Sequence, residues 1–396
     1  MHANRNAVPL ICFVVAMIDG YDTQMMSFLA PLISKEWGMA AGSFGKIFAS
    51  TYGGGAVGAT LIGIAADRFG RKTMLLFSLA LAGICVFFSA WSSGPSELML
   101  WRAVSGLGLG GAIPTISALT AQHAPLERRS SAVARMFLGY PVGAMVGGAI
   151  TAALMSSIGW RSVLMGGGMC AFLLVPLVWF CVTESSGGDT HALAATHSRH
   201  PLAELVADGR GWGTVLICAA TFLTLLVSYF LLSWTPTILT LVGTSPKRAA
   251  LATVVLNLGG LAGAWILSSL VRRNSPLVAI TAYLGVGSLL VALLGQGVIA
   301  TVLVAFLTVF VVGLLIIGAM SNLPALCVYY YPASVYGTGV GLGMAIGRLG
   351  SIVGPLIGGY LVSARMGWDR LFLLAALPAL TAALALAIVA VIRKGR

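Results

Sequence analysis

Long apolar segments separated by short polar stretches recur along the whole chain. Twelve of these segments are long enough to cross a hydrocarbon core of about 30 Å as helices. One long polar stretch at 183–210 divides them six and six. The pattern predicts an all-α integral membrane protein, with an N-terminal six-helix bundle at 1–182, a central loop at 183–210 and a C-terminal six-helix bundle at 211–396. The approximate bounds of the segments are 7–33, 43–66, 73–93, 97–120, 131–156, 160–182, 211–239, 248–271, 276–295, 298–328, 338–362 and 368–392.

The composition supports this prediction. Only 9% of the 396 residues are charged, and 58% are hydrophobic. A soluble domain carries about 25% charged residues, because its surface faces water. Most of the surface of this chain must therefore face lipid.

The net charge of +12 has a topological explanation. If both termini lie inside, fourteen of the 23 Lys and Arg residues fall in inside loops and segment ends, and seven fall in outside loops. Cytoplasmic loops of membrane proteins carry such an excess. We therefore expect both termini and the central loop in the cytoplasm, and we expect no nucleic-acid partner.

The two halves share a glycine pattern. Residues 139–148 and 350–359 both read G-x-x-V-G-x-x-x-G-G, at an offset of 211 residues. The same offset carries the first apolar segment onto the seventh, so we predict two pseudo-symmetric parallel repeats about an axis normal to the membrane. Small residues four apart let helices approach closely in lipid. The glycines serve either static packing or the sliding of helices during a conformational change.

Asp19 and Asp22 are the strongest chemical signal. Asp19 follows twelve residues of its segment, which places it roughly 18 Å into the bilayer at about 1.5 Å per residue. The spacing of three puts both carboxylates on one helix face. A charge at mid-membrane costs about 2.5–3.5 kcal/mol, and two buried neighbours do not readily both ionise. We predict that they bind the coupling protons; the alternative is an ion pair that only locks helices together.

Arg102 and Arg348 are the complementary cations. Arg348 lies ten residues into the eleventh segment, and Arg102 lies in the fourth. A guanidinium stays charged and offers a planar fork that matches a carboxylate. We predict that both bind an anionic substrate. Arg102 has a second interpretation, because it lies five residues after Glu97 and would either pair with it or extend to the interface.

A polar motif joins the second and third segments. The stretch 63–72 reads G-x-x-x-D-R-x-G-R-K. Its second glycine permits a tight turn, its basic residues hold the loop in the cytoplasm, and its aspartate suits a helix N-terminus or an arginine. We predict that the motif latches the inward gate; the alternative is a charge cluster that only sets topology. The predicted gating residues are Gly63, Asp67, Arg68, Gly70, Arg71 and Lys72.

This loop motif resembles the signature of the major facilitator superfamily. The D-G-x-D motif at 19–22, R-x-x-x-G-x-G-x-G at 102–110 and G-R-L-G at 347–350 resemble the aromatic acid:proton symporter family within it. The resemblance covers the whole chain and implies the major facilitator fold in a bacterial inner membrane. It also implies uptake of benzoate-like acids, hydroxybenzoates or hydroxyphenylpropionates with protons. Asp19, Asp22, Arg102 and Arg348 would be its coupling and substrate residues.

Three positions depart from the family pattern. Gln122 stands where an acid is usual at the inner end of helix four, and Tyr336 stands where an arginine is usual before helix eleven. The second copy of the loop motif, at 268–273, reads S-S-L-V-R-R without its aspartate. These departures predict an altered inward latch and leave the substrate within the family open.

The predicted function is symport of a small aromatic acid by alternating access, carried out by a monomer. A proton reaches the aspartate pair, and the carboxylate docks on Arg348 with help from Arg102. The neutralised site is then occluded, the halves rock, and both ligands leave inward. Candidates for stacking on the ring or bonding its hydroxyl, all of residue types that also serve packing, are Tyr140, Tyr229, Trp234, Ser321 and Asn322.

Other functions are possible. An efflux antiporter for organic acids or drugs is one alternative, because 139–148 resembles the helix-five glycine motif of drug antiporters. A receptor that binds aromatic acids without transport is another, although the modest central loop leaves little for a partner to hold.

An enzyme is not expected. The sequence has no nucleophile elbow, no P-loop and no His/Cys cluster. Its six cysteines lie in apolar segments without a C-x-x-C pair, and His191, His197 and His200 read as solvated side chains of the central loop. We therefore expect neither a metal site nor a cofactor.

Overall fold

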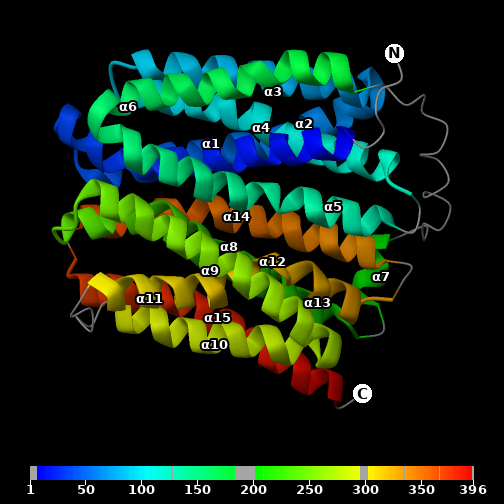
Figure 1. The fold of residues 1–396 in the computed structure, drawn as a ribbon. Coiled ribbons are helices and arrows are strands. Elements are labelled where there is room, and N and C mark those ends of the chain that lie inside the picture. The colour runs from blue at the N-terminus through cyan, green and yellow to red at the C-terminus, as the bar shows by residue number, and fades with distance from the viewer. Residues whose placement is uncertain are drawn as a thin grey trace. The chain divides into compact units, whose positions relative to one another are not determined.

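The structure is a computed structural model that describes residues 7–125, 128–182, 201–207, 209–294, 302–332, 335–364 and 366–394. These residues form helices and contain no strand (Figure 1). The helices are α1 (Ala7–Trp37), α2 (Phe44–Phe69), α3 (Arg71–Phe88), α4 (Pro95–His123), α5 (Arg129–Phe137), α6 (Gly139–Cys181), α7 (Pro201–Val206), α8 (Gly211–Leu241), α9 (Pro246–Arg273), α10 (Pro276–Leu294), α11 (Val302–Val312), α12 (Gly318–Ser321), α13 (Leu323–Tyr330), α14 (Tyr336–Ser363) and α15 (Trp368–Lys394), with short turns η1 (Ala41–Ser43), η2 (Ser89–Trp91) and η5 (Gly313–Ile317).

Eleven continuous spans among the described residues are long and apolar enough to cross a membrane. One of them, Ser131–Cys181, makes two crossings, because Gly159 interrupts α6 with φ 76° and ψ 166°. This backbone conformation is essentially restricted to glycine. The two arms of α6, 139–158 and 160–181, match the predicted segments 131–156 and 160–182. The predicted all-α membrane fold with twelve transmembrane helices is confirmed.

The segment predicted as one helix at 298–328 is divided in the structure. Within its described part, α11 passes into the π-helical turn η5 and then α12, and Asn322 (φ −104°, ψ 3°) separates α12 from α13. A π turn and a proline two residues after the break both disturb the helical hydrogen-bond ladder. Apolar periodicity did not predict the division, because this segment is apolar on all sides.

Contacts among the helices divide the chain into two compact units. Unit 1 comprises Met1–Ser186 and Ser233–Val254, and unit 2 comprises Gly187–Leu232 and Val255–Arg396. The division therefore cuts through α8 and α9. The domain boundaries expected at 182 and 211 stay a prediction, because most of the central loop lies outside the described residues.

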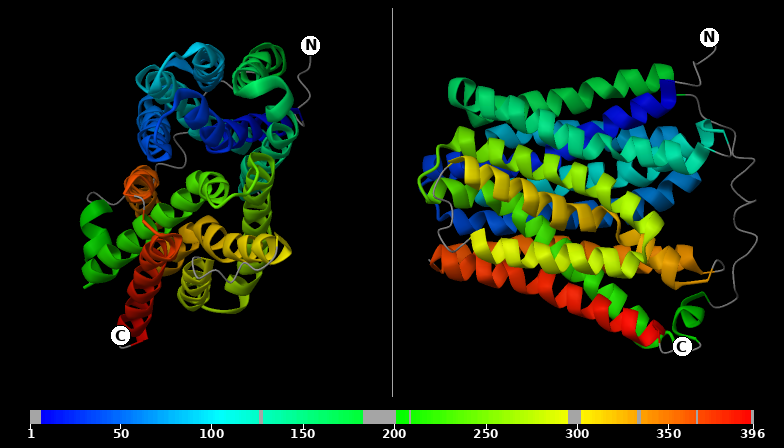
Figure 2. Two further views of the ribbon diagram at one scale, coloured as in Figure 1. Left: turned by 90° about the vertical axis from the view of Figure 1, so that its left-hand side faces the viewer. Right: turned by 60° about the horizontal axis from the view of Figure 1, so that its bottom comes forward.

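Glycines bring the helices of unit 1 into backbone contact. A side chain at Gly58 of α2 would collide with the carbonyl of Leu107 in α4, and one at Gly106 of α4 would collide with the carbonyl of Thr51 in α2. The end-on view in Figure 2 shows the blue, cyan and green helices α1 to α6 gathered side by side. Close approach of this kind is how helices pack where apolar burial provides no driving force.

The same unit repeats this device between α1 and α6. Side chains at Gly139 and Gly143 of α6 would strike the carbonyls of Phe13 and Met17 in α1. The first half of the glycine pattern therefore has a packing role.

Unit 2 contains equivalent contacts at constant sequence offsets. Gly263 meets the carbonyl of Leu314 as Gly58 meets that of Leu107, and Gly313 meets the carbonyl of Leu256 as Gly106 meets that of Thr51. In the same way, Gly350 and Gly354 of α14 meet the carbonyls of Phe222 and Leu226 in α8. The last two glycines lie 211 residues after Gly139 and Gly143. These recurring contacts confirm the repeat that was inferred from the glycine pattern.

The contacts predict different tolerances for two glycines of unit 2. Gly263→Val should destabilise the protein by about 3 kcal/mol or more, because the added atoms press on a backbone carbonyl rather than a flexible side chain. Gly285→Val in α10 is the matched control, since a Cβ there meets nothing within 4 Å. Thermal unfolding of the purified protein in detergent measures both. Equal unfolding temperatures for the two variants would contradict the packing role of Gly263.

Candidate functional site

A buried ion pair joins α1 to α4. Arg102 Nη1 donates to Asp22 Oδ1 at 2.7 Å, and Nη2 donates to Oδ2 at 2.9 Å and to the Asp22 main-chain carbonyl at 3.0 Å. Arg102 is 0% exposed and Asp22 is 4% exposed. Asp22 is also the central residue of the 31-residue helix α1, so the pair lies far from both ends of this span. This is the planar two-pronged geometry that makes Arg–carboxylate pairs strong.

The geometry settles which partner Arg102 has. The carboxylate of Glu97, the alternative partner considered for it, accepts hydrogen bonds from the main-chain N–H and the hydroxyl of Ser93 at 2.9 and 3.0 Å. Arg102 does not extend to the interface but turns inward to Asp22. Of the three guanidinium nitrogens of Arg102, the two Nη atoms have hydrogen-bond partners and Nε has none among the described residues.

The glycines of the two motifs position this pair. A side chain at Gly20 would collide with the carbonyl of Tyr140 in α6, so the glycine of D-G-x-D allows α1 to lie against α6. On α4, Gly106 lies against α2, and Gly108 lies against Ser78 and Ala82 of α3. Each glycine sets the position of a helix, and the helices place the charges.

Asp19 lies one turn before Asp22 on α1 and is also buried, with 7% exposure. Both predicted coupling carboxylates are therefore inside unit 1 and shielded from lipid. Removing one member of a buried pair leaves an uncompensated charge, which costs far more than losing a surface pair. The site can therefore change state only by moving a proton or by supplying a replacement ion.

Arg348 lies in unit 2, half-buried in the middle of α14. The flanking glycines again have packing roles: Gly347 lies against Thr221 and Leu225, and Gly350 lies against the carbonyl of Phe222, all on α8. The G-R-L-G motif therefore seats the arginine on a helix held directly against α8.

The five candidate ring-binding residues do not share one environment. Trp234 is fully buried and packs edge-on against Phe48, with ring centroids 5.5 Å apart. Tyr140 and Tyr229 are half-buried. Trp234 has the surroundings of a packing residue, while the two tyrosines retain an accessible part of their rings.

Ser321 and Asn322 lie at the division between α12 and α13. The Ser321 hydroxyl donates to the Ile317 carbonyl at 3.1 Å. The Asn322 amide donates to the carbonyls of Ala264 and Gly318 at 3.3 and 3.1 Å and accepts from the Ser268 hydroxyl at 3.0 Å. Asn322 therefore bonds one carbonyl of its own helix, that of Gly318, and ties the division to α9 through Ala264. Ser268, part of the loop motif that lacks its aspartate, is tied to this network.

The gating motif lies at the junction of α2 and α3. Gly70 adopts φ 90° at the turn, and Asp67, 78% exposed, lies 3.9 Å from Arg71. Lys72 Nζ donates to the carbonyl of Trp179 at 2.8 Å, near the end of α6. The exposed Asp67–Arg71 pair contributes little stability. Lys72, in contrast, bonds one of the carbonyls that the C-terminal end of α6 leaves without a main-chain donor within the helix. Gly63 is half-buried, and Arg68 lies over the ring of Phe69 at 5.6 Å.

Two of the positions that depart from the family pattern lie at helix ends. Gln122 is half-buried at the C-terminal end of α4, and Tyr336 begins α14. Among the described residues there is no group of three or more His, Cys, Asp or Glu side chains suited to a metal ion.

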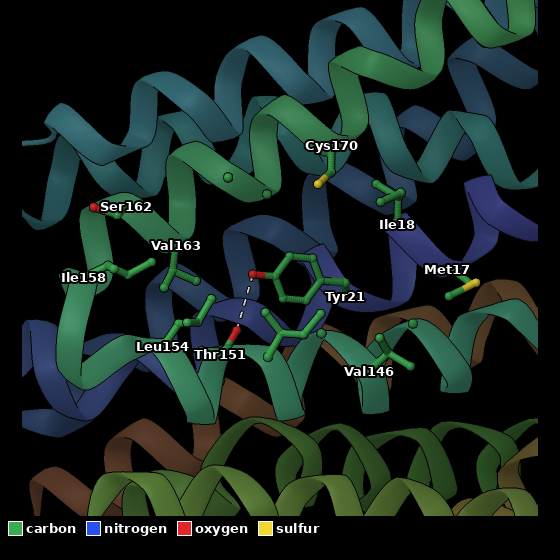
Figure 3. A pocket seen from close by; sticks show the side chains of 15 residues that line it. Met17, Ile18, Tyr21, Val146, Thr151, Leu154, Ile158, Ser162, Val163 and Cys170 are labelled. Atoms are coloured by element: carbon green, nitrogen blue, oxygen red, sulfur yellow. Dashed lines mark hydrogen bonds between the residues drawn. The ribbon is translucent and has the colours of Figure 1, made fainter.

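One feature near the site was not predicted from the sequence. A cavity of about 270 Å³ lies between α1 and the two arms of α6 (Figure 3). Tyr21, the variable position of D-G-x-D, points into it and bonds the Thr151 hydroxyl at 3.3 Å. No sequence signal pointed to this cavity, because periodicity alone does not distinguish a cavity wall from a packed face.

Comparison with known proteins supports the predicted family and fold. A model of the Major Facilitator Superfamily matches residues 12–355. A gallate transporter of Pseudomonas putida is 32% identical over 404 residues, covering 95% of this chain and 90% of that protein. A 3-(3-hydroxy-phenyl)propionate transporter of Escherichia coli is 33% identical over 360 residues, covering 90% of this chain and 87% of that protein.

A solved structure has the same fold. A bacterial homolog of the human lysosomal transporter Spinster matches with a TM-score of 0.80 and 18% sequence identity, covering 98% of this chain and 97% of that one. At this identity the match concerns the fold alone.

The ion pair predicts non-additive effects on stability. Arg102→Met should lower the free energy of unfolding by about 3–5 kcal/mol, because it leaves the Asp22 carboxylate buried without a cation. Asp22→Asn should also destabilise, and the double variant should cost less than the sum of the two single changes. Thermal unfolding of the four proteins in detergent completes the cycle. Strictly additive effects would show that the two side chains are not coupled.

Proposed function

This chain belongs to the major facilitator superfamily and, within it, to the family of aromatic acid transporters, and from this membership we propose that it imports a small aromatic carboxylic acid together with protons. It is a multi-pass membrane transport protein and not an enzyme. The two relatives are named for gallate and for 3-(3-hydroxyphenyl)propionate. Both compounds carry a carboxylate and a ring hydroxyl, so a hydroxylated aromatic acid is the proposed substrate class.

The observation that carries the proposal is the two-pronged bond between Asp22 and Arg102. A second carboxylate cannot take the same two N–H groups while the Asp22 carboxylate holds them. Protonation of Asp22 removes its charge and weakens both bonds. The guanidinium of Arg102 can then bind the carboxylate of the substrate, and this carboxylate neutralises the charge of Arg102 in place of Asp22. Proton and substrate are thereby coupled, because each favours the binding of the other.

In this proposal, the same exchange also prevents the carrier from moving the proton or the substrate alone. An uncompensated charge inside the protein costs several kcal/mol. If Asp22 is protonated and no anion replaces its carboxylate, Arg102 becomes such an uncompensated charge. Rearrangement of the carrier is therefore favoured with both ligands bound or with neither bound.

The other predicted residues have subordinate roles in the proposal. Asp19 is the second protonatable group on the buried part of α1. Arg348 is the anchor that α14 offers to the substrate carboxylate, and Tyr140 and Tyr229 offer ring faces. The motif at 63–72 latches the inward gate of a monomer in the bacterial inner membrane, with both termini in the cytoplasm.

The glycine stretch at 139–148 gives no separate support for efflux. Gly139 and Gly143 pack against α1 carbonyls, and Gly147 packs against the ring of Tyr21. A packing role accounts for all three, so the resemblance to drug antiporters adds no chemistry of its own.

Uptake into proteoliposomes tests the proposal. Purified protein should accumulate radiolabelled gallate or 3-(3-hydroxyphenyl)propionate when the outside is acid, and accumulation should disappear with a protonophore. Protein-free liposomes give the background, because protonated aromatic acids also cross lipid and follow the same gradient. Accumulation driven instead by an acid interior would establish antiport, and no protein-dependent uptake of any aromatic acid would overturn the function.

A substitution at Asp22 tests the coupling. Asp22→Asn keeps the shape of the side chain but cannot change charge, so gradient-driven accumulation should fall to background while exchange of labelled for unlabelled acid continues. Glu36→Gln is the matched control, because this exposed carboxylate near the C-terminal end of α1 pairs with Arg161. The control should keep its gradient dependence. Full accumulation by Asp22→Asn would exclude Asp22 as the proton site.

A further inference from the structure

The cavity beside Tyr21 is a groove on the flank of unit 1. Its floor is α1, and its walls are the two arms of α6 (Figure 3). All three stretches belong to membrane-spanning segments. The apolar side chains along the first arm are partly exposed: Val146 by 46%, Ile150 by 52%, Leu154 by 41% and Ile158 by 46%. What fills this groove in a membrane is therefore hydrocarbon or a solute dissolved in it.

The polar groups of the groove do not suit a polar ligand. Tyr21 and Thr151 bond to each other at 3.3 Å. The remaining walls are apolar side chains, glycines and the exposed thiol of Cys170, with the hydroxyl of Ser162 at the end beside the α6 bend. A binding site for a polar solute presents several convergent donors or acceptors. The lining of this groove offers only the mutually bonded Tyr21–Thr151 pair and the single hydroxyl of Ser162 at one end, so its occupant is apolar.

A glycine without a packing role keeps the groove open. In the run 166–168, a side chain at Gly168 would press on the main chain at Phe87, and one at Gly167 would lie against Met25 and Tyr21. A side chain at Gly166 would meet nothing within 4 Å. Gly166 lines the cavity, so its missing side chain leaves space for an occupant rather than for another helix.

The groove has a defined direction. Ile158 and Ser162 flank the bend of α6 at Gly159 and form one end, while Met17 and Cys170 form the other end, deeper in the two spans. At the bend, Arg161 is 47% exposed and forms an ion pair with Glu36. A cation and an anion at the mouth, and hydrocarbon below, match a phospholipid whose headgroup lies at the bend and whose chain enters the groove.

We propose that the groove is a binding site for one acyl chain of a membrane phospholipid, drawn from the leaflet at the α6 bend. The volume of about 270 Å³ lies just below the range of about 300–1,000 Å³ typical of drug-sized ligand pockets, and it accommodates part of a single chain rather than a whole lipid. The chain lies against the ring of Tyr21, next to Asp22 in sequence, and holds that ring against Gly147.

Photocrosslinking tests the site in the intact protein. The probe is a phosphatidylethanolamine with a diazirine at mid-chain, incorporated into proteoliposomes, and peptide mass spectrometry locates the adducts. Adducts on Val146, Ile150 and Cys170 should exceed those on Leu173 and Val391 severalfold. These two reference side chains are 63% and 71% exposed, so bulk lipid would label them at least as strongly.

Filling the groove provides the decisive comparison. Gly166→Leu should reduce the groove adducts severalfold and leave those on Val391 unchanged. Gly285→Leu is the matched control, since it also adds a side chain where a Cβ meets nothing within 4 Å, but on α10. Ile150→Trp serves as a second filling variant if Gly166→Leu does not fold. Groove adducts no stronger than those at the reference residues, or unchanged by both filling variants, would overturn the proposal. Transport is not part of this readout, so the site stands or falls independently of the proposed function.

Discussion

A charged pair with almost no exposure to solvent constrains the whole of unit 1. Asp22 and Arg102 lie on different helices, yet their atoms approach to within 3.0 Å. A separation of even a few ångströms would leave two ions unneutralised in a medium of low dielectric constant. The glycines at 20, 106 and 108 let α1 and α4 approach their neighbours closely enough to prevent this. In each motif the charged residues form the ion pair, and the glycines let the helices lie close enough for it to form.

The two repeats share this scaffold but not its charges. The equivalent glycine contacts relate Phe13 of α1 to Phe222 of α8, an offset of 209 residues, so Asp22 corresponds to Leu231. They relate Gly106 of α4 to Gly313 of η5, an offset of 207 residues, so Arg102 corresponds to Val309. Both Leu231 and Val309 are buried and apolar. Arg348 in turn corresponds to Phe137. Backbone contacts between glycines and carbonyls can be duplicated at no electrostatic cost, whereas each further buried ion carries a desolvation cost. The asymmetry therefore confines the buried ion pair, and with it the proposed proton chemistry, to unit 1.

Helix α1 presents different chemistry on its two sides. Asp22 bonds to Arg102 inside the unit, while its neighbour Tyr21 lines an apolar groove between the arms of α6 (Figure 3). Successive residues of a helix point about 100° apart, so adjacent positions face different surroundings. One turn of α1 thus meets both the ion pair and, in our proposal, a lipid chain. If both proposals hold, the bilayer and the proposed proton site act on the same short stretch of helix.

Much of this protein follows from its sequence alone. The length of the apolar segments, the repeat of the glycine pattern and the aspartates at 19 and 22 are local, one-dimensional signals, and they predicted the helices, the repeat and the candidate charges. Three features required the tertiary structure: the choice of Asp22 rather than Glu97 as the partner of Arg102, the engagement of Asn322 with the division of its helix, and the groove kept open by Gly166. Each depends on which helix lies opposite. Hydrophobic periodicity predicts whether a side chain is buried, but it does not identify the residue that the side chain contacts.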